Sequence, residues 1–340
     1  IGATVIISQY FGAKDYDNVN KTINTMFIVI SIASIIISFV GIIFSKYIFT
    51  FTNLPEDILP KAKIYINFYL SGLIFIFLFN GIAAILRGIG DSKTPLYFII
   101  FSTILNVILD IIFIYIMKMD IEGIAIANII SNATITITGI IYLNKKNKIF
   151  NIYINKLIFS KDIFYKSIKI GLPSGIQQSL VALGMLALFS IVNSFGTDTV
   201  AAYSIALRID SFASLPAMNF AAALTTFVGQ NIGAGKFQRI KKGYHFTLLI
   251  NSLFSIIISI IVILFSKNLM AMFSPETNVI QIGSKYLIIV CSFYILFSTM
   301  FINNAVIRGA GDTLVPMFIT LLSLWIIRIP LAYYLSNKNG

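Results

Sequence analysis

The chain contains the same loop sequence twice. Residues 86–91 read Leu-Arg-Gly-Ile-Gly-Asp and precede Pro95, and residues 307–312 read Ile-Arg-Gly-Ala-Gly-Asp and precede Pro316, a displacement of 221 residues. A constant displacement of this length indicates a duplicated domain rather than a short solenoid repeat. Further matches at the same displacement are Gln9, Gly12 and Ala13 with Gln230, Gly233 and Ala234, residues 44–46 with 265–267, and Tyr65 with Tyr286.

The duplicated domain has the composition of a membrane protein. Hydrophobic residues make up 58% of the chain and charged residues 11%, and the mean hydropathy is +0.91. A run of about 20 apolar residues crosses the hydrocarbon core, where the backbone must be helical or part of a closed barrel. The alternation typical of a β-barrel is missing. We predict an all-α polytopic membrane protein with spans at about 22–45, 62–86, 95–117, 122–144, 168–195, 198–230, 243–266, 284–307 and 316–337.

Counting the crossings between the repeated patches gives the relation of the two halves. Six crossings separate them, so both copies enter the membrane in the same direction. We expect two parallel six-helix bundles related by a pseudo-two-fold axis along the membrane normal. Counterparts of residues 168–221 would precede residue 1, and those of residues 122–144 would follow residue 340. The expectation is therefore a truncated chain, with an N-terminal lobe at 1–144, a linker at 145–167 and a C-terminal lobe at 168–340.

The basic residues predict the orientation. With loops assigned alternately to two sides, 16 Lys and Arg lie on one side, which includes residues 145–169, and 7 lie on the other. The positive-inside rule places the first side in the cytoplasm of a cell (inner or plasma) membrane. The net charge of +12 then reflects topology and attraction to the lipid bilayer, and not binding to nucleic acid. The linker resembles an interfacial amphipathic segment, or it simply ties two bundles together.

The repeated loops themselves favour a structural role over substrate contact. Their glycines permit a tight cytoplasmic turn with positive φ, and the prolines fit the first turn of the next helix. The aspartates either cap those helices or pair with the arginine of the same loop. The loop residues are Arg87, Gly88, Gly90, Asp91 and Pro95 in the first copy, and Arg308, Gly309, Gly311, Asp312 and Pro316 in the second. Gly12 and Gly233 are interpreted in the same way, as helix-end glycines.

The paired motifs resemble those of the multidrug and toxic compound extrusion (MATE) family, in particular bacterial cation-coupled drug antiporters. The shared patterns are Gln-x-x-Gly-Ala-(Gly)-Lys and Arg-Gly-x-Gly-Asp-x-x-x-Pro, each present in both halves, and the resemblance runs from residue 1 to about residue 334. It implies two lobes around a V-shaped cavity and alternating access. It also implies a monomer that exports small-molecule organic cations, aromatic ones above all, in exchange for H⁺ or Na⁺.

Ionisable residues inside spans are the functional candidates, because they are expensive in lipid. Asp110 lies four residues after Asn106 on one helix face, which offers two oxygens to a proton or Na⁺. Asp110 is equally open to a role as a structural hydrogen-bond partner. Asp210 is a further cation-coupling candidate. Arg208, two residues away, should face elsewhere and neutralise another carboxylate, and Arg328 is either a charge-balance residue for Asp110 or Asp210 or part of an inter-helix ion pair.

The seventh helix begins with residues 171–175, which contain two glycines and Pro173, a plausible gating element. Gln177 and Gln178 follow as candidates to line the cavity. Some members of the MATE family, which this chain resembles, carry acidic residues on the seventh and tenth helices. In this chain the corresponding residues 170–195 and 286–307 contain neither Asp nor Glu. Others use an aspartate on the first helix, which this chain is expected to lack. The coupling ion therefore stays open between H⁺ and Na⁺.

Other classes of protein fit less well. The sequence has no P-loop, nucleophile elbow or zinc motif, which argues against an ATP-driven pump or an enzyme. A lone His245 and a lone Cys291 predict neither a metal site nor a disulfide within the chain. We expect no cofactor beyond the coupling ion. The remaining alternatives are a lipid-linked oligosaccharide or peptidoglycan-precursor flippase, for which more cationic residues should lie inside the spans, and a membrane scaffold.

Overall fold

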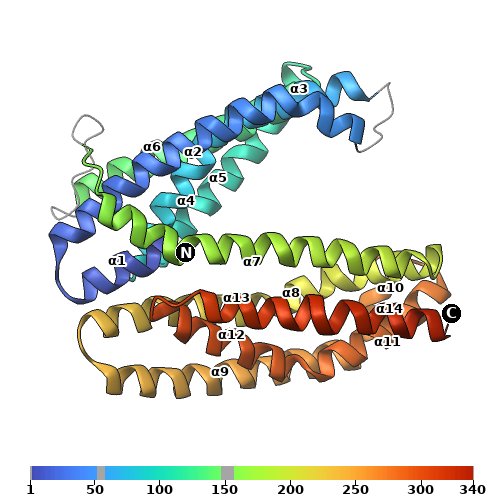
Figure 1. The fold of residues 1–340 in the computed structure, drawn as a ribbon. Coiled ribbons are helices and arrows are strands. Elements are labelled where there is room, and N and C mark those ends of the chain that lie inside the picture. Colours follow the sequence, from blue (N-terminus) through green and yellow to red (C-terminus); the bar gives the residue numbers. More distant parts are fainter. Residues whose placement is uncertain (1, 52–57, 147–156, 340) are drawn as a thin grey trace. The chain divides into compact units, whose positions relative to one another are not determined.

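The computed structural model describes residues 2–51, 58–146 and 157–339, which form helices and loops without a strand (Figure 1). The first helices are α1 (Gly2–Gly12), α2 (Tyr16–Phe51), α3 (Leu59–Ser71), α4 (Leu73–Gly88), α5 (Lys93–Ile111), the π-helix η1 (Ile112–Ile116) and α6 (Ile121–Lys146). They are followed by α7 (Lys161–Asn193), α8 (Thr197–Gly233), α9 (Phe237–Leu264), α10 (Ser266–Ala271), α11 (Thr277–Ser292), α12 (Tyr294–Gly309), α13 (Leu314–Leu321), the π-helix η3 (Leu322–Arg328) and α14 (Ile329–Asn339).

The helices fall into two compact units. The N-terminal unit contains residues 6–167, and the C-terminal unit contains Ile168–Gly340 together with Ile1–Val5. The predicted linker at 145–167 is partly helical, since α6 runs to Lys146 and α7 begins at Lys161, where Asp162 in the first turn suits a helix start. The predicted amphipathic segment at 149–159 lies largely outside the described residues.

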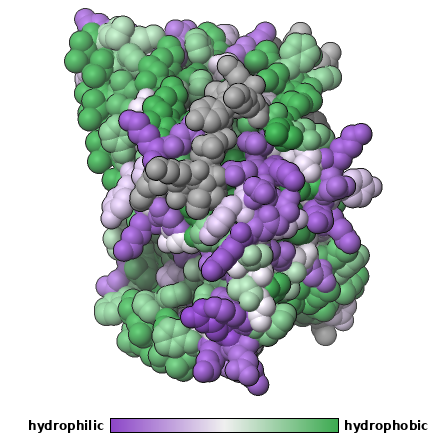
Figure 2. All heavy atoms as spheres, turned by 90° about the vertical axis from the view of Figure 1, so that its left-hand side faces the viewer, coloured by the Kyte–Doolittle hydropathy of each residue, from purple (hydrophilic) through white to green (hydrophobic). Residues whose placement is uncertain are grey.

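All nine predicted spans have a helical counterpart. Seven helices in the described part of the chain are individually long and apolar enough to cross a membrane, and two bent helix pairs bring the number to nine. Large apolar side chains are exposed along α2, α5 and α9, as lipid-facing surfaces require. Figure 2 looks onto the ends that carry the predicted cytoplasmic loops, where hydrophilic side chains gather. The polytopic all-α fold predicted from hydropathy is thereby confirmed.

The two bends occupy equivalent places in the repeat. The α3–α4 pair bends by 43° at Gly72 and the α11–α12 pair by 51° at Phe293, positions 221 residues apart. Each bend frees a backbone carbonyl that a serine hydroxyl on the neighbouring helix then hydrogen-bonds. Ser38 donates to the Leu70 carbonyl at 2.6 Å, and Ser259 donates to the Cys291 carbonyl at 2.7 Å, again 221 residues apart. The duplication therefore extends to individual hydrogen bonds.

The loop motifs are helix ends, with one correction to the sequence interpretation. Positive φ is found at Gly90 (93°) and Gly311 (96°), as predicted, but Gly88 and Gly309 are the last residues of α4 and α12. The first glycine of each motif is thus a helix residue and not a turn residue. The aspartates cap the next helix: Asp91 accepts hydrogen bonds from the Thr94 N–H and hydroxyl, and Asp312 from the N–H groups of Leu314 and Val315. Pro95 and Pro316 lie in the first turns of α5 and α13.

The glycines of the Gln-x-x-Gly-Ala patches lie at helix ends, as predicted. Gly12 and Gly233 end α1 and α8 in helical conformation, and the left-handed residues are Lys14 (φ 60°) and its repeat partner Gly235 (φ 69°). The N–H one residue further on then bonds back five residues, from Lys236 to the Asn231 carbonyl at 2.8 Å. This Schellman-type end needs its left-handed residue after the helix, which is why the helix-end glycine does not supply it.

Gly309 permits close packing of α12 on α8. A Cβ atom at this position would lie 2.7 Å from the Thr225 carbonyl oxygen and 2.8 Å from the Val228 Cβ. We expect Gly309→Ala to lower the free energy of unfolding by about 1–3 kcal/mol, because backbone must move to admit the methyl group. Gly175→Ala is the matched control, since nothing lies within 4 Å of its Cβ position. Thermal unfolding in detergent measures both, and equal midpoints would contradict the packing role.

Candidate functional site

The N-terminal unit holds an incomplete polar site on α5. The Oδ1 atom of Asp110 and the Nδ2 atom of Asn106 are both buried, and neither has a hydrogen-bond partner. The two side chains lie four residues apart, on one face of a helix whose other positions are largely exposed apolar residues. Buried polar atoms in native proteins are almost always satisfied, so these two atoms are unusual, and the Asp110 oxygen is the one of the two that could accept a proton or cation. The role of Asn106 and Asp110 in cation coupling stays a prediction.

Two further side chains share this property and were missed by sequence reasoning. The Asn67 Oδ1 atom on α3 and the Ser131 Oγ atom on α6 are buried without a partner. Helix α6 packs against both α3 and α5. Lys61 on α3 pairs with Asp120, just before α6, and these two residues mark one end of the unit. Asn67 follows Lys61 by six residues, and Asp110 precedes the end of η1 by six residues, so each lies about 9 Å from this end along its helix. Oxygen atoms of Asp, Asn and Ser are ligands suited to a proton or a hard cation.

The C-terminal unit places the second carboxylate in a different setting. Asp210 on α8 accepts a hydrogen bond from the hydroxyl of Tyr294. Tyr294 is the first residue of α12 after the bend. Tyr294 is 6% exposed and belongs to an apolar core cluster with Cys291 and Ile209. Among sixteen tyrosines nothing in the sequence singles out Tyr294.

The arginines are both exposed. Arg208 lies two residues before Asp210 on α8, and Arg328 ends η3. The charges of Arg328 and Asp210 both act on Tyr203 and Tyr286. The pairing of Arg328 with Asp110 or Asp210 stays a prediction.

Gln177 is not exposed to a cavity within its unit. Its side chain is 5% exposed, its Oε1 accepts from Arg308 Nη2 at 2.8 Å, and its Nε2 donates to Thr320 Oγ1 at 2.7 Å and to the Pro316 carbonyl at 3.2 Å. These contacts join α7 to the end of α12 and to α13. In contrast, Gln178 is exposed. Gln177 and Gln178 were predicted to line a cavity, but Gln177 lies inside α7 and hydrogen-bonds Arg308 in the last turn of α12.

Two loop aspartates are electrostatically perturbed. The side chain and N–H of Asn18 hydrogen-bond the Asp15 carboxylate and hold its pKa below the ordinary value. The Lys61 ammonium hydrogen-bonds Asp120 and likewise lowers the pKa of that carboxyl. Both groups lie in loops outside the spans and stay ionised at neutral pH. Within the described residues no group of three or more His, Cys, Asp or Glu could hold a metal ion.

Comparison with known proteins identifies the family. The model of the MatE family matches residues 1–112 and 173–334, most of both units. The chain belongs to the MATE family. The multidrug and toxic compound extrusion resemblance noted from the paired motifs is thus confirmed.

Curated relatives of this MATE protein cover nearly the whole chain. It is 30% identical over 335 residues to the probable multidrug resistance protein YpnP of Bacillus subtilis, with 98% of this chain and 75% of that protein aligned. It is 28% identical over 340 residues to the probable multidrug resistance protein NorM of Thermotoga maritima, with 98% and 72% aligned. These names are those of multidrug transporters, so the MATE protein is a membrane transporter and not an enzyme.

Solved structures confirm the MATE fold. The crystal structure of MATE in the bent conformation superimposes with a TM-score of 0.94 at 22% identity, covering 100% of this chain and 75% of the other. The outward-facing conformation of a multidrug resistance MATE family transporter of the MOP superfamily gives 0.91 at 21% identity, covering 99% and 75%.

Proposed function

We propose that this MATE protein exports cationic aromatic compounds across the cell membrane in exchange for inward H⁺ or Na⁺, with Asp110 and Asn106 as the coupling site. The observation that carries the proposal is the buried, unpartnered Oδ1 atom of Asp110, which shares a helix face with Asn106. A structural carboxylate in a membrane helix would be expected to hold a partner, whereas a site that binds and releases a cation in each cycle must be able to stand without one.

Two further observations support the same assignment. The buried oxygens of Asn67 and Ser131 come from α3 and α6, and α6 packs against both α3 and α5, so several uncommitted oxygen atoms belong to one small bundle. The multidrug resistance names of the relatives favour a drug exporter over the lipid-linked oligosaccharide or peptidoglycan-precursor flippase. Among residues in the described spans, Arg208 and Arg328 are exposed cations of the C-terminal unit, few for a pyrophosphate-binding flippase.

Ethidium efflux tests the function directly. Cells that produce the protein should retain several-fold less ethidium than cells that do not, because export lowers the steady-state level of the dye. If H⁺ drives transport, collapse of the proton gradient by a protonophore should abolish the difference in retained ethidium. If Na⁺ drives transport, replacement of Na⁺ by choline should abolish it. Equal retention under both gradients would refute drug antiport. Translocation of a lipid-linked sugar without dye efflux would support the flippase.

A further inference from the structure

Helix α8 meets α11 and α12 along a line of polar side chains. Tyr203 and Asp210 lie seven residues apart on α8 and therefore share a helix face, which packs on α11 and α12. The Tyr203 ring meets the Tyr286 ring of α11 edge-on with centroids 5.4 Å apart. One contact further along, Tyr294 of α12 donates to Asp210. The line thus passes from a pair of phenols to a carboxylate about 10 Å deeper along the helix.

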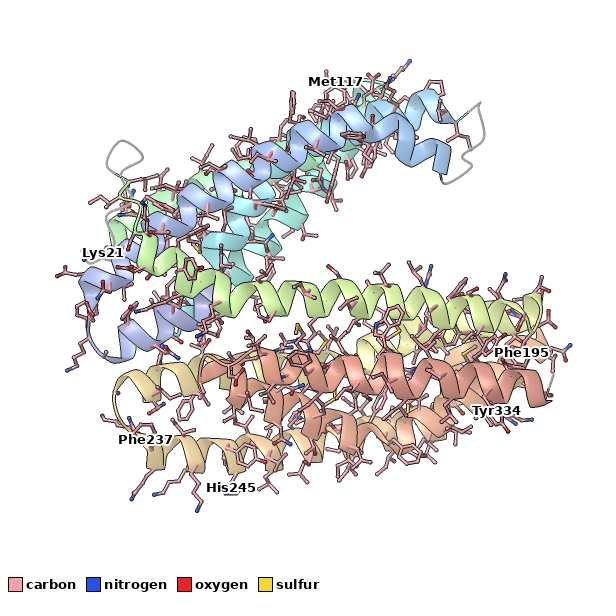
Figure 3. All side chains as sticks on the ribbon, in the orientation of Figure 1. Lys21, Met117, Phe195, Phe237, His245 and Tyr334 are labelled. Atoms are coloured by element: carbon pink, nitrogen blue, oxygen red, sulfur yellow. The ribbon has the colours of Figure 1, made fainter. Side chains whose placement is uncertain are left out.

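The same line begins at the end of the unit. Asn278 Nδ2 donates to Asp198 Oδ2 at 3.4 Å, in the first turns of α11 and α8. This is the end marked by Phe195 and Tyr334 in Figure 3, opposite to Phe237 and His245, and the distribution of lysines predicts that it faces the outside. The step from Asp198 to Tyr203 is about 8 Å along the helix. Two hydrogen bonds and one edge-on ring contact between α8 and the bent pair therefore lie between the predicted outer end and Asp210.

The surroundings of Asp210 select the size and charge of what could bind. Tyr203 is 8% exposed, Tyr294 6% and Cys291 1%, and Tyr294 and Cys291 belong to one apolar core cluster. The Asp210 carboxylate is therefore hydrogen-bonded to a side chain of a packed apolar cluster. A metal cation needs several further oxygen ligands, whereas α11 contributes the Cys291 thiol to the cluster that holds Tyr294.

The other elements around this cluster bring mainly apolar side chains, and η3 ends at the cation Arg328. The apolar residues of α9 and α10 packed into the cluster are Ile258, Val262, Ile263, Leu269 and Met270. The Ser259 hydroxyl of α9 also reaches the cluster and donates to the Cys291 carbonyl at 2.7 Å. A proton binds a single carboxylate oxygen without further ligands, which fits a carboxylate that is bonded to such a cluster.

We infer that Asp210 and Tyr294 form a proton-exchange site in the C-terminal unit, reached from the predicted outer end past Tyr203 and Tyr286. This deepens the proposed function and rests on it, because it gives the exporter a second ion site besides Asp110. A proton from outside ends on the Asp210 carboxylate, forming a carboxylic acid, and leaves from the same oxygen. Tyr294 keeps its own proton throughout and turns its hydroxyl from hydrogen-bond donor to acceptor.

The position of Tyr294 links this proton to the bend. Tyr294 follows Phe293 directly, where α12 departs from α11 by 51°. The Tyr294 hydroxyl donates to a carboxylate and accepts from a carboxylic acid. Protonation of Asp210 therefore changes the hydrogen bond that ties the start of α12 to α8. The equivalent residue in the N-terminal unit is Leu73, so this tie belongs to the C-terminal unit.

Infrared difference spectroscopy tests the site without any transport measurement. For the purified protein in lipid nanodiscs, acid-minus-neutral spectra should contain a carboxylic acid C=O band that is lost in Asp210→Asn. In Tyr294→Phe the band should persist at a shifted frequency, because the acid has lost its hydroxyl partner. Tyr244→Phe is the matched control, as the Tyr244 hydroxyl donates to Asn303 Oδ1 of the same α12 at 2.9 Å, and it should leave the band unchanged.

The outcomes separate this inference from the proposed function. Asp110→Asn should keep the Asp210 band while it stops transport, and Asp210→Asn should slow proton-driven ethidium transport about tenfold or more. Identical spectra of Asp210→Asn and the unmodified protein would overturn the inference and leave Asp110 unaffected. If Asp210→Asn does not fold, Tyr294→Phe decides, since it keeps the carboxylate. An unshifted band in Tyr294→Phe would then overturn the pairing.

Discussion

Asp110→Asn should reduce ethidium efflux to the level of cells without the protein. An amide can neither bind and release a proton nor neutralise Na⁺, so either coupling ion loses its site. Because the ion gradient supplies the driving force of an antiporter, loss of the ion site removes net export against a dye gradient. We expect a loss of about tenfold or more in initial efflux rate, measured at matched protein levels in the membrane.

The stability of the same variant separates coupling from structure. Asp110 Oδ1 is buried without a partner, so the carboxylate carries a desolvation cost that no hydrogen bond offsets. Asparagine has the same shape and is neutral. The thermal midpoint of Asp110→Asn should therefore stay unchanged or rise, as is common where a functional group is kept at the expense of stability. A structural carboxylate would show the opposite result, a lower midpoint.

Asp162→Asn is the matched control. Asp162 is exposed in the first turn of α7, so the same chemical change there should alter neither efflux nor the thermal midpoint. Unchanged efflux in Asp110→Asn would remove this residue from the mechanism. A lower midpoint together with reduced efflux would assign Asp110 to the structure of the N-terminal unit.

Hydropathy and the internal repeat predicted the fold to the level of spans and turns. Apolar length fixes the number of spans because lipid leaves the backbone few alternatives to helix. The bends were not predicted, since Phe293 stands within an apolar run that reads as one straight helix. Only the tertiary hydrogen bonds of Ser38 and Ser259 show that the two breaks are equivalent.

The sequence predicted only those residues of the candidate site that lie together on one helix. Asn106 and Asp110 share a face at helical spacing, which is local information. Asn67 and Ser131 lie on other helices, so their relation to Asp110 depends on packing that the sequence pattern does not encode. Gln177 was misinterpreted for the same reason, because its partner Arg308 is 131 residues away.

The duplicated halves have diverged where ions are expected to bind. At the repeat displacement, Asp110 corresponds to Leu331 and Asn106 to Ile327, while Tyr294 corresponds to Leu73. The shared features are the turns, the bends and the serine hydroxyls that support them. Asp110 and Tyr294 therefore have apolar counterparts in the other half. Two scaffolds that bend alike but differ at these positions can respond to ions separately, as a transporter with one site in each unit requires.

Gln177→Leu should destabilise the C-terminal unit by about 3 kcal/mol. The leucine removes the acceptor of Arg308 Nη2, whose Nε is already buried without a partner, and leaves a guanidinium poorly satisfied among packed helices. It also removes the hydrogen bonds from Nε2 to Thr320 and to the Pro316 carbonyl that hold α7 on α13. Denaturant unfolding in mixed micelles, or the thermal midpoint in detergent, measures the loss.

Gln178→Leu provides the control at the adjacent position. Gln178 is exposed, so its replacement should change the free energy of unfolding by no more than about 0.5 kcal/mol. The double variant Gln177→Leu with Arg308→Met should cost less than the sum of the single changes, because removing the guanidinium also removes the group left unsatisfied. Additive costs, or equal effects of Gln177→Leu and Gln178→Leu, would show that the Arg308 loop is held by other contacts.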